Sequence, residues 1–369
     1  MQECQDFVRG CTFLGTGGGG PPERGLSVLR AALEAGRPVG WVDVAEIPDD
    51  AWTCTAFGMG SIAPRKPLPA EELDRYGLQE GPWSLASPIR ELEREVGVKI
   101  SVVVPSEIGG SNTPGPVNAA SELGIVAVDG DYCGRAVPEI TQGTSAITGK
   151  PGWPLAAVDR WGNVSVIKKA ASLPMSERIG KMLAVAAFGG VGMAGTLLQA
   201  RDMKAIVVPN TLTRSYQLGR AIREAREKAL DPAQEVAQVG GGWVLFRGKV
   251  VRREWEDRDG YMFGTHELDG VQEWQGHRYR VWFKNENHAC WLDGEPHVTS
   301  PDIIAVVELE SGEPKTNTMI AEGDLLALVG LPAAAVIFRS PAGIEALGPR
   351  HFGFDIDYVP IEDRLQVGV

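Results

Sequence analysis

Apolar residues recur at helical spacing in some segments of the chain, and in others they run continuously or alternate. Residues 22–35 begin with a proline and place Leu26, Leu29, Ala32 and Leu33 on one face, which predicts a helix that Gly36 ends. Further helices are predicted over residues 3–12, 87–97, 116–124, 174–188 and 211–230, and strands over residues 38–44, 51–61, 99–110 and 125–131. Since helices alternate with apolar strands, the first part of the chain is predicted to be an α/β domain with a mostly parallel sheet.

The pattern changes near residue 155. Two strand-like runs flank a Trp-Gly-Asn turn within residues 155–170, which predicts a hairpin. Strands dominate residues 240–330, and their density favours a second, β-rich domain. We therefore predict an α/β domain over residues 1–165 and a β-rich domain with two helices over residues 166–369. No low-complexity linker separates them, so the two domains are expected to pack tightly.

Charge and cysteine content narrow the classes of function. The formal net charge of −12 repels phosphate backbones, so nucleic acid is not an expected partner. Five scattered cysteines without a Cys-x-x-Cys pair argue against a disulfide framework and against a structural zinc site, and they favour a cytoplasmic setting. The uncharged stretch over residues 182–200 contains four glycines, which favours a buried helix followed by a glycine-rich turn over a membrane span.

The segment FLGTGGGGPP, residues 13–22, places four consecutive glycines between two predicted helices. Gly15, Gly17 and Gly20 have the spacing of a dinucleotide-binding loop, but no clear strand precedes them, and no lysine follows as a P-loop requires. The backbone N–H groups of Gly17, Gly18 and Gly19 can instead hold a ligand or a developing negative charge. A tight structural turn and a true dinucleotide site remain as alternatives.

A second candidate segment, residues 105–124, follows a buried strand and opens a helix. Ligands of open α/β sheets bind at such strand ends, and Glu107 and Asn112 are placed to reach one. Gly109 and Gly110 allow the backbone to come close to a ligand. In the structural alternative, Asn112 caps the helix and Glu107 pairs with an arginine.

A third segment, residues 128–139, also follows a strand and concentrates charge. Asp129, Asp131, Arg135 and Glu139 lie within eleven residues, the mixture that general acid–base chemistry or a divalent metal ion needs. The alternative is a salt-bridge network around Arg135. Cys133 lies between them and is a candidate nucleophile only if a base lowers the pKa of its thiol.

The fourth segment reads FKNENHACW, residues 283–291. In a regular strand, Asn285 and Asn287 share one face, while Glu286 and His288 share the other. A polar cluster in an apolar strand is costly unless it lines a site, although a strand end or a turn also explains it.

Together and in this order, LGTGGGG, EIGGSN, VDGDYCGRAVPE, NEN and the PDIIAVVE…SGEP run resemble the S-methyl-thiohydantoin desulfurase-like family over nearly the whole chain. The resemblance implies an α/β N-terminal domain and a β-rich, swivelling-type C-terminal domain. It also implies replacement of the methylthio group of an S-methyl-thiohydantoin by oxygen, which gives a hydantoin and methanethiol. The chain departs from the family's pattern at residues 129–134 and 58–67, and both segments are expected to touch the substrate pocket.

That chemistry requires water to attack a carbon between two ring nitrogens. Asp129, Asp131 or Glu107, or a hydroxide on a divalent metal, is expected to supply the base. The glycine-loop N–H groups, Asn112 and Arg135 are candidates to stabilise the developing charge, and Glu139 or Glu286 to protonate the departing thiolate. The expected substrate-binding set is completed by Asn285, Glu286 and Asn287.

Two further functions stay open from the sequence. One is an accessory subunit of an ATP-using hydantoinase or oxoprolinase assembly, in which GTGGGG holds phosphate; the other is a small-molecule sensor. In each case the expected partner is a small molecule rather than nucleic acid or membrane, and a homo-oligomer is expected. The cofactor stays unknown, with a divalent metal as the candidate.

Overall fold

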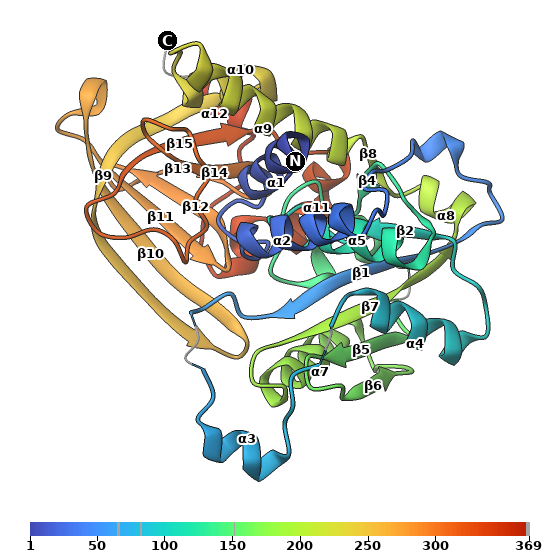
Figure 1. Ribbon diagram of the computed structural model, residues 1–369. Helices are drawn as coiled ribbons and strands as arrows, with labels where there is room; N and C mark the ends of the chain where they lie inside the picture. The colour runs from blue at the N-terminus through green and yellow to red at the C-terminus, as the bar shows by residue number, and fades with distance from the viewer. Residues whose placement is uncertain (65–66, 82, 151, 367–369) are drawn as a thin grey trace.

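The computed structural model describes residues 1–64, 67–81, 83–150 and 152–366 of the chain (Figure 1). Its α-helices are α1 (Gln2–Leu14), α2 (Pro22–Glu34), α3 (Ala70–Tyr76), α4 (Ala86–Val96), α5 (Pro114–Leu123), α6 (Thr144–Ile147), α7 (Leu173–Ala186), α8 (Ala200–Lys204), α9 (Thr211–Glu227), α10 (Pro232–Gly240), α11 (Pro341–Leu347) and α12 (Ile361–Gln366). Its strands are β1 (Trp52–Gly60), β2 (Val102–Pro105), β3 (Val126–Ala127), β4 (Gly130–Asp131), β5 (Leu155–Asp159), β6 (Val164–Ile167), β7 (Gly190–Gln199), β8 (Val208–Pro209), β9 (Trp243–Arg258), β10 (Tyr261–Gly270), β11 (Arg278–Lys284), β12 (Glu286–Leu292), β13 (Glu295–Thr299), β14 (Ile303–Glu308) and β15 (Leu325–Leu331).

The first sheet has six strands in the order β3-β2-β1-β7-β5-β6. β1, β2 and β3 are parallel, as the α/β pattern predicted, whereas β7, β5 and β6 join antiparallel to their neighbours. The sheet is therefore mixed rather than mostly parallel, because the hairpin predicted over residues 155–170 and the strand after α7 add to the edge of β1. Gly190, Gly192 and Gly195 lie in β7, so of the four glycines in the predicted turn only Gly189 precedes the strand. The predicted strand over residues 38–44 is reduced to a single bridge, Val42 to Val128.

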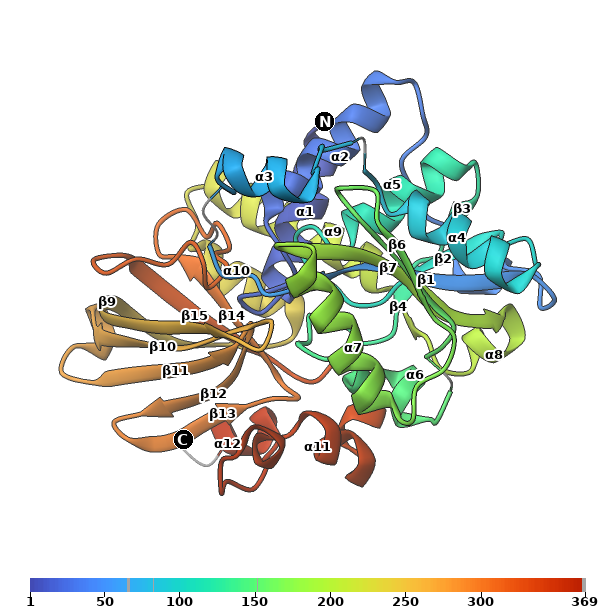
Figure 2. The same ribbon diagram turned by 90° about the horizontal axis from the view of Figure 1, so that it is seen from below.

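The second sheet has seven antiparallel strands in the order β13-β12-β11-β10-β9-β15-β14. It curls beside the first sheet, and Figure 2 shows the two sheets side by side with α11 and α12 beneath the second. The α/β part and the β-rich part of the prediction are confirmed by this arrangement. β7 follows the domain boundary predicted at residue 165 in the sequence, yet it belongs to the first sheet, since it pairs with β1 and β5. No helix among the described residues is long and apolar enough to cross a membrane.

Helices α1 and α9 cross in direct backbone contact, and this crossing fixes the glycine loop that follows α1. A Cβ added to Gly10 would lie 1.6 Å from the carbonyl oxygen of Ser215, and one added to Gly219 would lie 1.8 Å from that of Asp6. Neither neighbour is a side chain that can turn away, so only glycine allows this approach. The loop over residues 15–20 therefore starts from a rigid support.

We expect Gly10→Ala to lower the free energy of unfolding by about 3 kcal/mol, because the methyl group forces the two helices apart. Gly40→Ala is the matched control, since nothing lies within 4 Å of its added Cβ. Urea unfolding of both variants measures the difference. Equal stability of the two variants would contradict the close packing of α1 on α9.

Candidate active site

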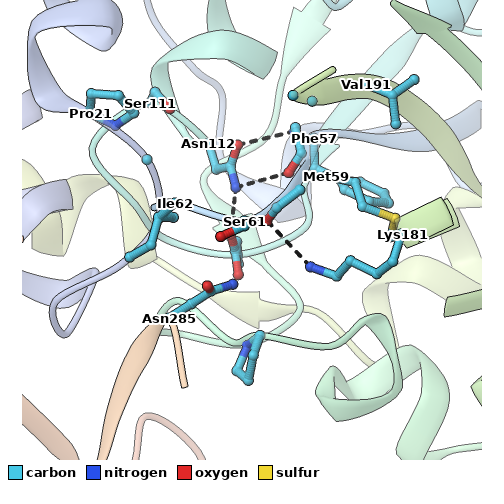
Figure 3. A pocket seen from close by; sticks show the side chains of 18 of the residues that line it. Pro21, Phe57, Met59, Ser61, Ile62, Ser111, Asn112, Lys181, Val191 and Asn285 are labelled. Atoms are coloured by element: carbon cyan, nitrogen blue, oxygen red, sulfur yellow. Dashed lines mark hydrogen bonds between the residues drawn. The ribbon is translucent and has the colours of Figure 1, made fainter. Parts of the chain in front are cut away.

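A cavity of about 490 Å³ opens where the carboxyl ends of β1 and β2 meet the turn between β11 and β12 (Figure 3). In open α/β sheets this strand edge is the usual place for a ligand. The walls come from the glycine loop, the ends of β1 and β2, the segment after Arg135, helix α7 and the turn at Asn285. Both sheets thus contribute side chains to one hollow.

Glu107 follows β2 and lies in the cavity wall with only 7% of its surface exposed. Its Oε1 accepts a hydrogen bond from Asn112 Nδ2 at 2.6 Å, and its Oε2 accepts one from the N–H of Val137 at 2.7 Å. Asn112 also accepts from the N–H of Gly58 at 3.0 Å, so it connects Glu107 to β1 (Figure 3). Glu107 has no arginine partner among the described residues, and Asn112 holds Glu107 rather than capping α5.

Glu286 begins β12 and reaches the same cavity from the second sheet. Its Oε1 accepts a hydrogen bond from the N–H of Gly19 at 3.2 Å, while its Oε2 is buried without a hydrogen-bond partner among the described residues. A Cβ on Gly18 would lie 1.9 Å from Oε1, so glycine at this position makes room for the carboxyl group. The glycine loop is thus shaped around a side chain of its own chain.

The two buried carboxyl groups influence one another. Burial raises the pKa of Glu107 to about 7, although the hydrogen bonds from Val137 and Asn112 lower it. Burial, together with the negative charge of Glu107, raises the pKa of Glu286 to about 8, although the charges of Arg135 and Lys181 act against this. Because Glu107 accepts two N–H bonds and Glu286 only one, Glu107 is the more acidic of the two carboxyl groups.

Glu139 also lines the cavity, but its surroundings lower the pKa of its carboxyl group instead of raising it. Burial would raise its pKa, yet the hydrogen bond from His351 and the charge of Lys284 lower it to about 2. Its carboxylate forms ion pairs with both of these residues. Glu139 therefore stays ionised, and the expectation that it is a proton donor to a leaving thiolate does not suit this environment.

Lys181 is a cavity residue that the sequence reasoning missed. It lies on α7, is 4% exposed, and places its ammonium 3.4 Å from the carbonyl oxygen of Gly60 (Figure 3). Its ion pair with Glu177 is long, at 3.8 Å, and Glu177 accepts a hydrogen bond from the hydroxyl of Tyr261. A lysine on an amphipathic helix looks like a surface residue in sequence, so no spacing could have identified it.

Asp129 lies away from the cavity wall. One carboxyl oxygen accepts hydrogen bonds from the N–H groups of Leu212 and Thr213, and the other accepts from the Thr213 hydroxyl. These groups form the N-terminus of α9, where a carboxylate satisfies free N–H donors. Asp129 therefore acts as a cap for α9 in this structure, and both of its oxygens are occupied.

Asp131 and Arg135 are buried between the two sheets, outside the residues that line the cavity. Asp131 accepts hydrogen bonds from the N–H groups of Cys133 and Gly134, and burial raises its pKa to about 7. Arg135 donates to the carbonyl oxygens of Ala136, Asp302 and Asn287 and to the hydroxyl of Thr16. These hydrogen bonds all go to oxygens of the protein, so Arg135 connects separate segments of the chain rather than facing a ligand. Burial also raises the pKa of the Cys133 thiol, which leaves it neutral.

The predicted glycines have two roles. Gly19 and Gly20 line the cavity, whereas Gly17, Gly18, Gly109 and Gly110 lie behind its wall. A Cβ on Gly109 would lie 2.3 Å from the Cα of Gly19, so the two loops touch through their backbones. The carbonyl oxygen of Gly19 accepts from the N–H groups of Ser111 and Asn112. These glycines therefore position Glu107 and Glu286 by close backbone packing.

The alternation predicted for residues 285–288 fails at Asn285, which lies in the turn before β12. Asn285 and Glu286 both line the cavity, because Asn285 has φ +57° and turns the chain between β11 and β12. Asn285 Oδ1 accepts from the N–H of Met262. Asn287 is fully buried and donates to the carbonyl oxygen of Ile304, and His288 stacks on Phe352. The alternative interpretation as a turn explains this segment better than a regular strand.

One of the two segments that depart from the family's pattern lines the cavity. Residues 58–64 form a continuous part of its wall, while residues 65–66 lie outside the described residues. Residues 129–134 do not line it; Tyr132 and Cys133 border a small adjoining hollow of about 30 Å³. Sequence differences from the family's pattern that change contacts with the substrate are therefore expected at the end of β1.

The donor set does not suit a resident metal ion. Among the described residues, no three His, Cys, Asp or Glu side chains gather as ligands would. Of the four oxygens of Glu107 and Glu286, three already accept N–H bonds. We therefore derive no chemical step through a metal, and the divalent ion stays a prediction from the sequence.

Stability is expected to depend on pH through these groups. Glu107, Asp131 and Glu286 keep their protons to about pH 7 or 8 when folded but lose them near pH 4 when unfolded, so the stability present at low pH is lost as pH rises. Three buried histidines, His266, His288 and His297, have lowered pKa values, so they make the folded state more stable as pH rises. This opposite effect is confined to pH values below about 6.5, where unfolded histidine takes up a proton. The free energy of unfolding should therefore fall between pH 6.5 and 8.5, by about 2 kcal/mol from Glu286 alone.

Urea unfolding at pH 6.5, 7.5 and 8.5 measures this fall, and Glu286→Gln should reduce it. A fall of equal size in the wild-type chain and the variant would show that Glu286 ionises in the folded protein as it does in water.

The comparisons agree with this architecture. The description "S-Me-THD-like, N-terminal domain" matches residues 2–169, and "S-Me-THD-like, C-terminal domain" matches residues 171–361. A crystal structure of a protein from Chromobacterium violaceum, determined by the Northeast Structural Genomics Consortium, has a TM-score of 0.77 over 98% of both chains at 21% identity, which shows a common fold. No curated protein matches the sequence. The two family descriptions together cover nearly the whole chain, which therefore belongs to the S-methyl-thiohydantoin desulfurase-like family.

Proposed function

We propose that this chain is a hydrolase that acts on a small cyclic amide or amidine, an S-methyl-thiohydantoin or a hydantoin-like ring. The observation that carries the proposal is the pair Glu107 and Glu286, two buried carboxyl groups in one cavity with unequal environments. Such a pair supplies a base and an acid at the same pH. The family description supports the ring class, and the reaction itself is our inference.

Glu107 is the base in this proposal. Two N–H donors stabilise its carboxylate, which takes a proton from water as the oxygen attacks the ring carbon that bears sulfur. Glu286 is the acid, because its pKa is the higher of the two and its buried Oε2 accepts no hydrogen bond from the described residues. The carbon–sulfur bond breaks and methanethiol leaves. Glu107 passes the first water proton to a ring nitrogen, which becomes an N–H of the hydantoin. Glu286 gives its proton to the sulfur and takes the second water proton from the hydroxyl group as the carbonyl forms, so both carboxyl groups return to their starting state.

Lys181 and Asn285 are placed to stabilise the charge that builds on the ring. The Lys181 ammonium is buried in the wall, where a charge is worth more than in water. Asn285 uses its Oδ1 on Met262 and makes no hydrogen bond through Nδ2 to another described residue, which leaves this donor for a ring oxygen or nitrogen. These two donors take the role that the sequence gave to the glycine N–H groups and Arg135.

The nucleotide-binding alternative has less support. The carboxylate of Glu286 already accepts the Gly19 N–H that a phosphate would need. Pro21 and Pro22 open α2, and neither has an N–H group to give. A phosphate in this loop would therefore face a carboxyl group and few free donors.

The test incubates the full-length protein with an S-methyl-thiohydantoin, a hydantoin and a lactam. Methanethiol is measured with a thiol reagent and the ring product by chromatography. We expect one methanethiol for each hydantoin formed. Absence of turnover on every ring would overturn the proposal, and binding without turnover would favour the sensor. Elemental analysis of the same sample tests the divalent metal, and its sedimentation tests the homo-oligomer; both, with the cytoplasmic setting, stay predictions.

A further inference from the structure

The long hairpin of the second sheet ends beside helix α7, as Figure 2 shows. Its strands β9 and β10 are joined at Asp259 and Gly260, and β10 begins at Tyr261. A Cβ added to Gly260 would lie 3.2 Å from Cδ of Lys181, and Gly260 has φ +81°, so glycine lets the hairpin turn close beside the stem of this lysine. Tyr261 is thereby brought to α7, although it lies outside the cavity wall.

The ring of Tyr261 contacts two ammonium groups. The Nζ atoms of Lys181 and Lys284 each lie 4.1 Å from the ring centroid. The face of an aromatic ring attracts a cation, most strongly where water is excluded, and Tyr261 is only 8% exposed. Lys284 is in turn held by its ion pair with Glu139. The ring therefore has a fixed place beside the ammonium of Lys181.

The hydroxyl group of Tyr261 occupies the carboxylate that is nearest to Lys181. It donates a hydrogen bond of 2.7 Å to Glu177 Oε1, while the N–H of Ile140 donates to Oε2 at 2.9 Å. Burial and the charge of Glu177 raise the pKa of Tyr261, so the phenol keeps its proton and is the donor. Both oxygens of Glu177 thus have a donor other than Lys181.

The ion pair between Lys181 and Glu177 is left open. The two residues lie four positions apart on α7, a spacing at which side chains can meet directly. An ammonium–carboxylate hydrogen bond is normally about 2.8 Å long. Here Nζ lies 3.8 Å from Oε1 and 3.4 Å from the carbonyl oxygen of Gly60. The ammonium is therefore held in the cavity wall without a close carboxylate to neutralise it.

We infer that Tyr261 is a positioning residue, which keeps the Lys181–Glu177 pair open so that the Lys181 ammonium is directed at the substrate. Its hydroxyl group occupies Glu177, and its ring supports the ammonium in place of the carboxylate. This inference rests on the proposed function, in which Lys181 stabilises the charge that builds on the ring. A closed ion pair would cancel much of that effect, because the carboxylate would neutralise the ammonium before the reaction begins.

Tyr261→Phe tests the inference, since it removes the hydroxyl group and keeps the ring. We expect Lys181 to close its pair with Glu177, so that the Nζ–Oε1 distance shortens from 3.8 Å to about 2.8 Å. We also expect kcat to fall about tenfold while KM changes about twofold or less, because the lost interaction is one that strengthens as charge develops. Crystal structures of the wild-type chain and the variant, and methanethiol release by both, measure these quantities.

The same substitution in a Lys181→Met chain separates positioning from a structural role. If Tyr261 acts through Lys181, its hydroxyl group has no further effect on kcat once the ammonium is gone. Tyr279→Phe is the matched control. Tyr279 is a buried tyrosine of the same sheet, its hydroxyl group bonds to His297, and it lies outside the cavity wall, so this variant should keep the wild-type kcat.

An unchanged kcat in Tyr261→Phe, an equal loss of kcat with and without Lys181, or an Nζ–Oε1 distance that stays near 3.8 Å would each overturn the inference. Turnover by the wild-type chain together with an unchanged distance in the variant would leave the proposed function standing and remove the role of Tyr261. If the wild-type chain released methanethiol from no ring, the proposed hydrolysis would fall. The two crystal structures would then decide alone whether Tyr261 keeps the pair open.

Discussion

Glu286→Gln is expected to lower kcat by about two to four orders of magnitude and to leave the fold unchanged, because it removes the proton donor but not its shape. Gln is isosteric with protonated Glu286. Its oxygen can keep the bond from the Gly19 N–H, and its amide nitrogen takes the position of the unpartnered Oε2. Thermal unfolding should therefore be close to that of the wild-type chain at pH 6.5.

Steady-state release of methanethiol and circular dichroism of the same sample measure the two quantities. Glu295→Gln is the matched control, since Glu295 is exposed on β13, outside the cavity wall, and its replacement should leave kcat unchanged. Wild-type turnover in Glu286→Gln would remove Glu286 from the mechanism. A loss of turnover together with a collapse of the fold would show that Glu286 supports structure instead.

Much of the fold follows from local sequence signals. The helices α1, α2, α4, α5, α7 and α9 lie where the spacing of apolar residues predicted them, and Gly97 ends α4 in the left-handed conformation. The strand partners were not predictable in the same way. β7 pairs with β1, which lies more than a hundred residues away, and pairing at that range depends on the assembled core rather than on local propensity.

The candidate site was predictable only at its strand ends. Glu107, Asn112 and Glu286 were identified because each follows a buried strand or interrupts one, and the structure brings all three to one cavity. Asp129 and Asp131 carry the same signal and yet turn to N–H groups of the protein. A carboxylate that caps a helix and one that faces a ligand look alike in sequence, because the difference depends on where a distant helix begins.

Lys181, Arg24 and Arg160 show the opposite limitation. Each is a basic residue in a segment that reads as a solvated surface, and only the folded chain shows that all three line the cavity. The glycine loop required the structure for its cause as well. Its glycines leave room for the Glu286 carboxyl group and for the backbone of residue 109, neither of which its own sequence indicates.

The pH dependence of turnover follows from the unequal pair. A base must be ionised and an acid protonated, so kcat/KM should rise through the pKa of Glu107, about 7, and fall through that of Glu286, about 8. These pKa values belong to the protein without substrate, so the profile is measured as kcat/KM. The two carboxyl groups interact, so the two limbs report the pair and not each residue separately. The optimum is therefore expected to be narrow.

Glu107→Gln is expected to lower kcat by about two to four orders of magnitude and to abolish the rising limb of that profile. It should also destabilise the fold by about 1–3 kcal/mol, since its amide nitrogen must face one of the two N–H donors, Asn112 or Val137. Leu328→Ala separates the two effects, because Leu328 is buried in the core of the second sheet outside the cavity wall. Its truncation destabilises the chain and should keep the kcat of its folded fraction. If Glu107→Gln retained the rising limb, another group would have to be the base, and the assignment of Glu107 would fall while Glu286 could still be the acid.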